Sequence, residues 1–546
     1  MQHKYSKIAV VFLGLLVINI ISYNLYKRFD LTEDHRYTLS KTSVNIVEAI
    51  EEPIFIKVYL EGDFPAEFKR LQTETKLHLE ELKAINKNIQ FRFINPKDIA
   101  EELVEKGLKP SRLQVQENGK LSEIVIFPWA VVSYKNKTEP VSLLKDIFAN
   151  SQNEQLESSI QNLEYAFTNA IHILTSKKEK KIAIIKGNGE LNDIYIADFL
   201  RKLREYYRLA PFTLDSVATQ PQKTYEALTK FDLIIISKPT KHFTEEEKYT
   251  LDQYTMNGGK SLWLIDNVQA ELDSLMQTGE SLAYPRDLNL TDLFFNYGFR
   301  INYDLVNDVY SSKIPLATGN VGNQTQFSSF NWNYFPLVNS TNNHPINTNI
   351  EAVNLKFANS IDTLKNDIQK TILLESSEIS KSQGTPSIIA LKSIAEKINP
   401  STYKNGHIPL AVLLEGNFKS GYAGRTKPYL IPNSKEQSNQ TKMIIVADGD
   451  IIANAISKGQ PLELGVDKWS NQRYGNKEFL LNSVNYLLDD IGLINIRAKH
   501  IKINFLDKEK AFNEATTWQL INILFPLLLL AIFGVIFNYF RKKKYQ

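Results

Sequence analysis

Two long apolar runs, one near each end of the chain, bracket a region in which apolar and polar residues alternate. The run at residues 520–540 has no charged residue and is long enough to cross the roughly 30 Å hydrocarbon layer as a helix. Aromatic residues and four adjacent cations close it, which is typical of a membrane boundary and rare after a buried core helix, the alternative. The predicted membrane-interface residues are Trp518, Tyr539, Arg541, Lys542, Lys543 and Lys544.

The other apolar run covers residues 8–26. A cleaved signal peptide is the alternative here, but the run exceeds a usual signal-peptide core and no A-x-A-like site follows Ile21. We therefore expect an uncleaved membrane anchor at residues 1–28, and a second membrane helix with a basic tail at residues 518–546.

Lysines and arginines near the spans predict their orientation. Residues 541–544 lie directly against the second span, which favours a cytoplasmic C-terminus. With two spans the N-terminus is then also cytoplasmic, and the region between them lies outside. Lys27, Arg28, Lys508 and Lys510 lie on the opposite sides, although long domains are translocated largely regardless of such charges.

The pattern after the first span predicts a small α/β domain at residues 29–150. Strand patterns at residues 54–60 and 89–94 alternate with helix patterns, and residues 123–134 and 141–144 look like a hairpin. This order is compatible with a thioredoxin-like domain. Because no Cys-x-x-Cys motif is present, the shape implies no redox chemistry.

A connecting helix is predicted at residues 151–178, where apolar residues recur at near-heptad spacing. Docking on a flanking domain is the simple interpretation. A dimerising coiled coil is the alternative, but the run is short for one.

A second, larger α/β domain follows. Its strand patterns at residues 181–186, 233–237 and 261–265 are apolar and alternate with helix patterns, which predicts a parallel sheet covered on both faces. The pattern weakens and then resumes with strands at residues 408–414 and 443–447. The domain is therefore divided into a first part, an insertion with loops and β-structure, a second part and a juxtamembrane linker. These segments are residues 179–308, 309–406, 407–495 and 496–517.

Composition excludes several functions. Lys and Arg total 64 against 61 for Asp and Glu. The net charge is therefore too small to create a positive electrostatic field that would favour binding of nucleic acid. The absence of cysteine removes disulfides, cysteine-ligated zinc, iron–sulfur clusters and thiol catalysis together. The histidines are scattered without metal-binding spacing, so we predict neither a metal nor a cofactor.

Two turns after predicted strands carry candidate ligand-binding residues. Gly187, Asn188 and Gly189 lie between a strand and a helix pattern, where backbone N–H groups can face an anion. Such glycines more often only permit a tight reversal. Asp448 and Asp450 have the oxygens to bind a divalent cation, but helix capping by Asp450 and turn stabilisation by Asp448 are the simpler explanation.

An aromatic and asparagine-rich stretch, residues 330–336, lies in the insertion. Loop packing is its simplest interpretation. A sugar platform and a partner surface are the alternatives, the second because aromatic residues are enriched at contact hot spots.

Several segments together resemble the gliding-motility ABC-transporter component family GldG of the Bacteroidetes. The likeness extends over nearly the whole chain, including both anchors. It implies a subunit of the bacterial inner membrane with its main region in the periplasm, without ATPase activity, working with ABC permease and ATPase subunits on separate chains. It also implies a class I glutamine amidotransferase-like fold for the larger domain. The resembling segments are residues 163–174, 187–190, 303–308, 413–425, 448–450, 475–488 and 506–545.

The amidotransferase likeness raises the question of a nucleophile. The turn after residues 261–265 carries Asp266 and Asn267 in place of Cys or Ser, and the chain contains no G-x-S-x-G. Residues 258–261, GGKS, lack the first glycine of a phosphate-binding loop, so ATP hydrolysis is not predicted. We therefore predict no enzymatic activity and keep Asp266 as a candidate ligand-binding residue.

The leading hypothesis is a two-span subunit of an ABC-type complex, with a periplasmic region that binds a partner or a ligand. A cell-envelope hydrolase on an amidotransferase-like fold and a purely structural scaffold are the alternatives. The sequence lacks the nucleophile that the hydrolase needs.

Overall fold

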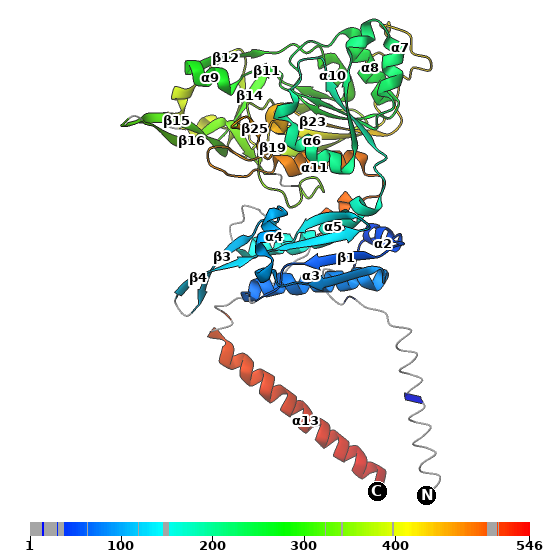
Figure 1. The fold of residues 1–546 in the computed structure, drawn as a ribbon, viewed down its shortest axis with the longest axis vertical. Coiled ribbons are helices and arrows are strands. Elements are labelled where there is room, and N and C mark those ends of the chain that lie inside the picture. The colour runs from blue at the N-terminus through cyan, green and yellow to red at the C-terminus, as the bar shows by residue number, and fades with distance from the viewer. Residues whose placement is uncertain are drawn as a thin grey trace. The chain divides into compact units, whose positions relative to one another are not determined.

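The computed structural model describes residues 14–15, 30, 38–62, 64–117, 120–145, 152–322, 324–339, 342–395, 398–499, 510 and 513–545. The chain divides into two compact units, residues 1–500 and 501–546. The first unit is a mixed α/β structure, as expected (Figure 1). The predicted first span, residues 8–26, lies outside the described residues except for Gly14 and Leu15.

The small domain is a four-stranded sheet of order β2-β1-β5-β6. Strands β1 and β2 are parallel because α3 crosses between them, whereas β5 pairs antiparallel with both β1 and β6. The thioredoxin-like assignment stays a prediction. The elements are α2 (Lys41–Glu48), β1 (Ile54–Val58), α3 (Ala66–Ile85), β2 (Ile89–Phe93), η1 (Pro96–Asp98), α4 (Ala100–Glu105), β3 (Ser111–Glu117), β4 (Lys120–Ile126), β5 (Trp129–Tyr134) and β6 (Lys137–Ser142).

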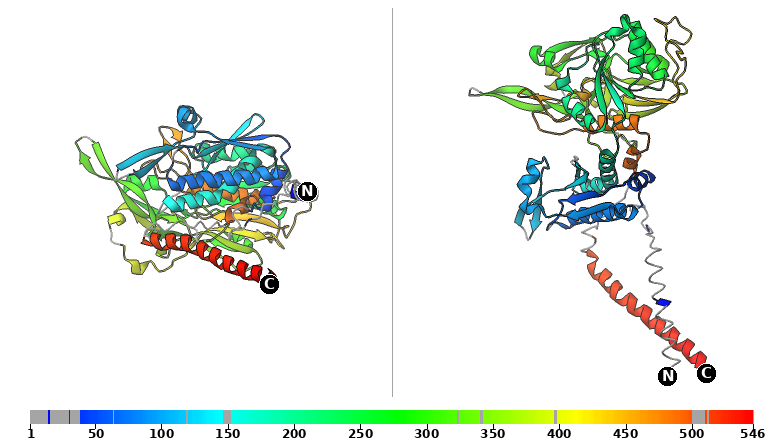
Figure 2. Two further views of the ribbon diagram at one scale, coloured as in Figure 1. Left: turned by 90° about the horizontal axis from the view of Figure 1, so that it is seen from below. Right: turned by 45° about the vertical axis from the view of Figure 1, so that its right-hand side comes forward.

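The connecting helix α5 (Gln152–Thr175) packs against α3, and the two lie side by side in Figure 2. Its apolar residues Ile160, Leu163, Phe167 and Ile171 are buried, which agrees with docking on the flanking domain. Helix α2 also packs on α5. The side of α5 that periodicity identified as apolar is therefore internal to this chain.

The larger domain is a seven-stranded sheet of order β19-β22-β23-β10-β9-β7-β8. Five neighbouring strands, β23 to β8 in that order, are parallel, as predicted. The elements outside its insertion are β7 (Lys181–Lys186), η2 (Asp193–Tyr195), α6 (Ala197–Tyr206), β8 (Arg208–Thr213), η3 (Asp215–Ala218), α7 (Pro221–Leu228), β9 (Leu233–Ser237), α8 (Glu245–Met256), β10 (Lys260–Leu264), α10 (Thr291–Tyr297), β22 (Pro409–Gly416), β23 (Thr441–Val446), η6 (Asp450–Ile452), β24 (Ile456–Ser457), β25 (Gln460–Pro461), α11 (Asn476–Leu488) and η7 (Ile494–Ala498).

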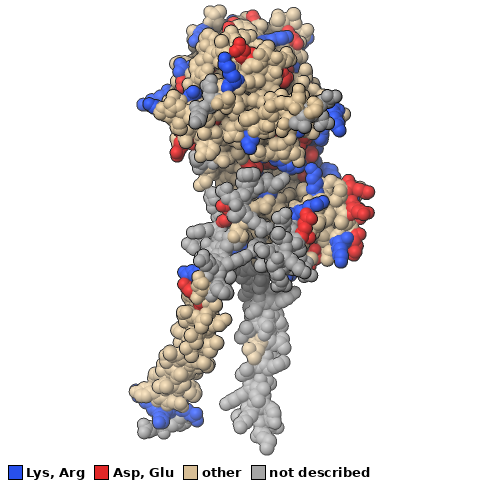
Figure 3. Space-filling model, turned by 90° about the vertical axis from the view of Figure 1, so that its left-hand side faces the viewer, with Lys and Arg blue, Asp and Glu red and all other residues tan. Residues whose placement is uncertain are grey.

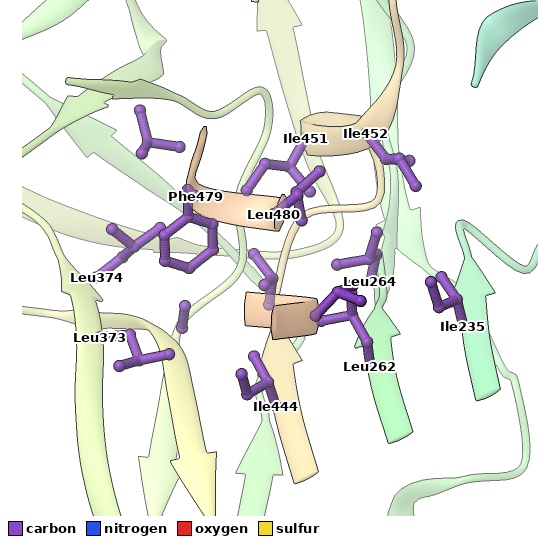
Figure 4. Close-up of a cluster of buried hydrophobic side chains, with 14 of the residues drawn as sticks. Ile235, Leu262, Leu264, Leu373, Leu374, Ile444, Ile451, Ile452, Phe479 and Leu480 are labelled. Atoms are coloured by element: carbon purple, nitrogen blue, oxygen red, sulfur yellow. The ribbon is translucent and has the colours of Figure 1, made fainter. Parts of the chain in front are cut away.

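Apolar cores cover both faces of this sheet, which explains why its central strands are apolar throughout. On one face Leu262 and Ile444 pack under Phe479 and Leu480 of α11 (Figure 4). On the other face Trp263 packs edge-on against Phe294 of α10. The sheet is thus a rigid platform that fixes the ends of its strands.

Smaller sheets surround the insertion. The hairpin of β15 and β16 is the longest ribbon and projects from the body of the domain in Figure 1. The three-stranded sheet β11-β12-β21 joins residues before the predicted insertion boundary to residues within it. The elements are β11 (Val268–Gln269), α9 (Leu272–Thr278), β12 (Glu280–Pro285), β13 (Phe299–Ile301), β14 (Asp304–Asp308), β15 (Ser311–Val321), β16 (Gln324–Val338), β17 (Val353–Asn354), β18 (Ile361–Thr363), β19 (Gln369–Glu375), β20 (Ser380–Gly384), β21 (Ser387–Ala390), η4 (Leu391–Ala395) and η5 (Pro400–Thr402).

Three local predictions need correction. The strand predicted at residues 408–414 exists as β22 but runs antiparallel to β23, so it does not continue the parallel sheet. The strand predicted at residues 123–134 is two strands, β4 and β5, broken at Pro128, which has no N–H to donate to a ladder. The helix pattern that follows the strand predicted at residues 181–186 begins as the short η2 before α6.

The second unit contains α13 (Ala515–Tyr545), the one helix among the described residues that is long and apolar enough to cross a membrane. Its most apolar 18-residue window has a mean hydropathy of 2.8 and is not buried at all, unlike the helix of a protein core. The helix continues through Pro526. Figure 3 shows its apolar surface ending in blue lysine and arginine side chains, which belong to residues 541–544.

Candidate functional site

The parallel strands end at one edge of the large sheet, and the sequence places charged residues directly after three of them. Lys238 follows β9, Asp266 follows β10, and Asp448 and Asp450 follow β23. Because β9, β10 and β23 are neighbours, these side chains meet. We call this group, with Glu271 and Arg286 from the β11–β12 region, the carboxyl-edge cluster. All three aspartates predicted as ligand-binding residues belong to it.

Lys238 lies at the centre of this cluster. Its Nζ is 2.8 Å from both carboxylate oxygens of Asp450, 3.1 Å from Glu271 Oε2 and 3.5 Å from Asp266 Oδ2. Burial alone would lower the pKa of Lys238, but the surrounding carboxylates outweigh it and raise that pKa. The lysine is therefore a cation and occupies the position in which a bound metal ion would meet these oxygens.

The backbone around Lys238 is unusual for a lysine. Its φ of 53° is in the left-handed region, which side chains with a Cβ rarely adopt. Gly449 packs against it so closely that a Cβ on Gly449 would lie 2.6 Å from Lys238 Cβ. The glycine between the two aspartates is thus required by the close approach of the turns that follow β9 and β23.

Two aspartates of the cluster are fully desolvated. Burial raises the pKa of Asp266 to about 6, although Lys238 opposes this shift. Burial, with Asp266 and Asp450 nearby, raises the pKa of Asp448 well above its usual range. Asp448 accepts hydrogen bonds from the backbone N–H groups of Lys356 and Asp450, each at 2.7 Å. Asp448 thus stabilises the turn, as the simpler interpretation expected, and joins it to the insertion.

Asp450 does not cap a helix. The residue at the N-cap of η6 is Gly449, and the carboxylate of Asp450 is engaged by Lys238 instead. Arg286 places Nη2 3.5 Å from Glu271 Oε1 and Nη1 3.9 Å from Asp266 Oδ2. The cluster is therefore a closed ion-pair network that fastens the β11–β12 region to the sheet, and among the described residues no group of His, Asp and Glu has the geometry of a metal site.

The glycine-rich turn at residues 187–189 lies very close to the segment that follows β9. Gly187 and Gly189 have φ values of 120° and 77°, and a Cβ on Gly189 would lie 2.1 Å from Thr240 Oγ1. The carbonyl of Asn188 accepts the N–H groups of Thr240 and Lys241, while its amide donates to Glu247 at 3.0 Å. Glu247 also completes a capping box at the start of α8 with Thr244. Anion binding at this turn stays a prediction.

A second polar group, which we call the junction, lies on α5. Glu164 is 5% exposed, and its Oε1 accepts the backbone N–H of Ser40 at 2.7 Å and the hydroxyl of Ser43 at 2.8 Å. Its Oε2 lies 3.0 Å from Lys499 Nζ. Ser40 is the N-cap of α2, so this one carboxylate fixes the start of the small domain.

The junction brings together the two ends of the described part of the first unit. Lys499 Nζ donates to the carbonyl of Thr38 at 2.7 Å, and Thr42 Oγ1 donates to the carbonyl of Ile491 at 3.1 Å. Apolar contacts of Tyr165 with Leu493 support these polar ones. The segment that follows the first predicted span thus meets the segment that precedes the second.

Electrostatics of the junction favour a charged glutamate beside a neutral histidine. Burial alone would raise the pKa of Glu164, but Lys499 and the N–H of Ser40 outweigh it and lower that pKa. Burial lowers the pKa of His78, on α3, to about 4. The His78 ring lies 5.8 Å from that of Phe167, and its buried Nε2 has no hydrogen-bond partner among the described residues.

A cavity of about 410 Å³ adjoins the junction. It is lined by α5, by the C-terminal ends of α6 and α11, and by the segment before η7. Tyr165 and Leu493 belong both to its wall and to the apolar part of the junction. The cavity and the junction therefore share part of one wall.

Sequence reasoning missed Lys238 and the junction for different reasons. Lys238 obeys the same strand-end rule that selected Asp266, so the signal was present. Glu164 adjoins the apolar stripe of α5, beside Leu163 and four residues before the buried Thr168. A carboxylate at that position is a recognisable signal for a buried partner. Its partners are distant in sequence, and no local pattern identifies them.

Comparisons with known proteins identify the family of this chain. The model of a family described as an ABC-type uncharacterized transport system matches residues 179–483, more than half of the chain. The chain belongs to this family, which indicates a subunit associated with an ABC transport system, and α13 agrees with membrane attachment. A domain of unknown function, DUF7088, matches residues 33–133.

Two further similarities were found. An uncharacterized protein of Borreliella burgdorferi is 21% identical over 560 residues, covering 100% of both chains. The solved mmIFT52 N-terminal domain is 12% identical, with a TM-score of 0.30, covering 57% of this chain and 98% of that domain.

Proposed function

We propose that this chain is a non-ATPase membrane subunit of an ABC-type transport complex, inserted in the bacterial inner membrane by one span at each end. The permease and the ATPase are separate chains. The resemblance to the GldG family associates the complex with gliding motility. The region between the spans is periplasmic in this proposal, and its large sheet domain binds a partner or a ligand.

The meeting of residues 38–43 with residues 491–499 around Glu164 is the observation that carries the proposal. A soluble region inserted in one bilayer through both ends needs those ends close together. Lys499 contacts both Glu164 and Thr38, which supports such an arrangement. A shuttling solute-binding protein needs at most one tether, so a double tether suits a permanent subunit.

The closed carboxyl-edge cluster supports a role without catalysis. The cation that would polarise a substrate is Lys238, and its charge is balanced by Asp450 and Glu271. Asp266, where an amidotransferase-like fold would carry its nucleophile, binds the N–H of Gly449. The envelope hydrolase therefore has no observation in its favour.

Reporter fusions test the topology. A reporter that is active only in the cytoplasm should be active after Gln546 and silent when inserted at Gly322, in the turn between β15 and β16. A periplasm-specific reporter should show the reverse pattern at both positions. Activity of the cytoplasmic reporter at Gly322 would contradict the proposed orientation.

The second span offers a test of association with a permease. Gly534 and Asn538 are one helical turn apart in α13, where a small residue permits close approach and an amide can hydrogen-bond a neighbouring helix. A polyleucine span should insert equally well but recover less permease. Equal recovery would place the association in the periplasmic region and leave this face to the lipid.

A further inference from the structure

The four-stranded sheet of the small domain has one open face. Helices α3 and α5 contact its strands on the other face, where Ile54 and Ile56 are buried. On the open face the side chain of Phe55 is 51% exposed, and it lies between Gln90 of β2 and Ser133 of β5. An open sheet face is ordinary by itself, but the charges on this one are not.

Two cations lie directly opposite each other on this open face. Lys57 of β1 and Arg92 of β2 are register partners, so their side chains project to the same side of the sheet. Like charges in neighbouring positions destabilise a sheet. Neither side chain forms an ion pair with a described residue, and the carboxylate of nearby Glu102 is engaged by Lys106. The fold therefore keeps a repulsive pair that an acidic group from another molecule would stabilise.

Strand β2 is also a free edge of this sheet. The N–H of Ile94 donates to the carbonyl of Val58, so the even-numbered residues of β2 face β1. The backbone N–H and C=O groups of Phe91 and Phe93 therefore point away from the sheet, and no described residue bonds to them. Such groups can pair with another extended chain, which then adds to the sheet as a strand.

The other edges of the two main sheets are protected. Edge strand β6 contains Pro140 and edge strand β8 contains Pro211, which have no N–H to offer a further strand. On β19, the side-chain amides of Asn342 and Asn347 donate to backbone carbonyl groups. Strand β2 has neither protection among the described residues, so its edge stays available for pairing.

We propose that the β2 edge binds an extended acidic segment of another polypeptide, which adds to the small sheet as a further strand. The open N–H and C=O groups recognise the extended backbone, while Arg92 and Lys57 recognise carboxylates on its alternate side chains. The same cations oppose pairing with a second copy of this chain, because each copy would bring its own cations to the edge. The segment belongs to another subunit of the complex, a placement that rests on the function proposed above.

Synthetic strand peptides test this surface on the purified full chain in nanodiscs of phosphatidylcholine, a lipid without net charge. The acidic probe alternates Glu with Thr, and two matched probes carry Lys or Gln in place of Glu. Calorimetric titration should show one acidic peptide bound per chain, with an affinity that falls as salt is added. Binding of the Lys probe as tight as that of the acidic probe, or no binding of the acidic probe, would overturn the proposal.

A further probe separates strand addition from charge attraction alone. It is the acidic peptide with N-methylated backbone amides, which keeps its carboxylates but cannot donate backbone hydrogen bonds to the edge. It should bind at least about tenfold more weakly, because several hydrogen bonds are lost. Binding as tight as that of the unmodified peptide would show attraction by charge alone and contradict strand addition.

Arg92→Glu assigns the binding to this edge. It changes an exposed side chain and gives Lys57 an opposite charge as its neighbour, so the melting temperature should not fall. The acidic peptide should bind at least about tenfold more weakly to this variant, and the Lys probe more tightly. Lys137→Glu, at an exposed lysine of the proline-containing edge strand β6, is the matched control and should bind like the parent.

Two results with Arg92→Glu would contradict the assignment. Unchanged binding of the acidic peptide would place it elsewhere on the chain. A lower melting temperature would show that Arg92 has a structural partner, so its charge would not be available to a bound segment.

A second copy of the chain is the alternative occupant of the edge. The chain contains no cysteine, so Gln90→Cys provides a single thiol on the exposed side of β2. Under mild oxidation it should form no more disulfide-linked dimer than Lys137→Cys does, and a clear excess would assign the edge to a second copy and overturn the proposal. These measurements use the chain without any other subunit, so their failure would leave membership in an ABC complex untouched.

Discussion

Glu164 and Lys499, which are 335 positions apart in the sequence, form an ion pair in which Oε2 and Nζ are separated by 3.0 Å. Glu164 lies in the middle of the connecting helix, and Lys499 lies at the end of the described part of the first unit. The same carboxylate also holds the N-cap of α2. One buried side chain thereby joins the start and the end of the soluble region to the helix between its two domains.

Loss of this carboxylate should destabilise the fold. Glu164→Gln should lower the free energy of unfolding by about 1–3 kcal/mol, because the Ser43 hydroxyl and the Lys499 ammonium lose a charged acceptor. Denaturant unfolding, followed by circular dichroism, measures the change. Glu154→Gln on an exposed part of the same helix is the control, and an equal effect in both variants would contradict a special role for Glu164.

The pair itself can be measured with a double-mutant cycle. Lys499→Met combined with Glu164→Gln should destabilise less than the sum of the single changes, with a coupling of at least about 0.5 kcal/mol. Lys499 is partly exposed, so its single variant should be the milder one. Strict additivity of the two effects would show that the observed contact contributes nothing to stability.

Burial of His78 contributes a loss of stability between pH 7 and pH 5, against which the raised pKa of Asp266, about 6, contributes a gain. Burial lowers the pKa of His78 to about 4, whereas an unfolded histidine titrates near about 6.5. Between these values the unfolded state binds more protons, so acid favours unfolding, by about 1–2 kcal/mol at pH 5. The stability due to the lowered pKa of Glu164 is lost only as the pH falls below about 4.5, the ordinary pKa of a glutamate, and therefore outside this window.

His78→Leu should remove this contribution, so the variant should lose about 1–2 kcal/mol less stability than the parent between pH 7 and pH 5, because no proton is then taken up at this position on unfolding. Thermal unfolding of both proteins at pH 7, 6 and 5 provides the comparison. A variant that loses as much stability as the parent between pH 7 and pH 5 would assign the effect to other groups.

The carboxyl-edge cluster should stabilise the fold and should not bind a divalent cation. Lys238→Met leaves Asp450 and Asp266 without their cation, and should destabilise the chain by about 3–5 kcal/mol, as expected for a broken buried pair. The exposed Lys241→Met is the matched control. Adding Mg²⁺ or Ca²⁺ should not raise the melting temperature of the parent chain, and a clear rise would revive the cation hypothesis.

Features set by local patterns were predicted well. The apolar strands β7, β9 and β10 follow from burial on both faces of the sheet. The direction of β22 was missed because the apolar pattern of a buried strand is the same whether it pairs parallel or antiparallel with its neighbour. Strand β8 was missed because it lies at the edge of the sheet and is only partly buried.

The candidate site was predicted only in part, for a related reason. Strand ends can be predicted from sequence, which placed Asp266 and Asp448 in turns after predicted strands. Whether a carboxylate there meets a metal or a lysine depends on how neighbouring strands approach, and Lys238 reaches the others through its left-handed backbone. The junction at Glu164 depends on contacts across most of the chain, so no local pattern contains it.

The most direct test of the central claim is purification of the tagged full chain from its native membrane in mild detergent, with mass spectrometry of the proteins that accompany it. The account predicts one polytopic permease and one nucleotide-binding ATPase in fixed ratio to this chain. A chain that purifies alone, with its fold intact, would contradict the claim that it is a permanent subunit of an ABC-type complex.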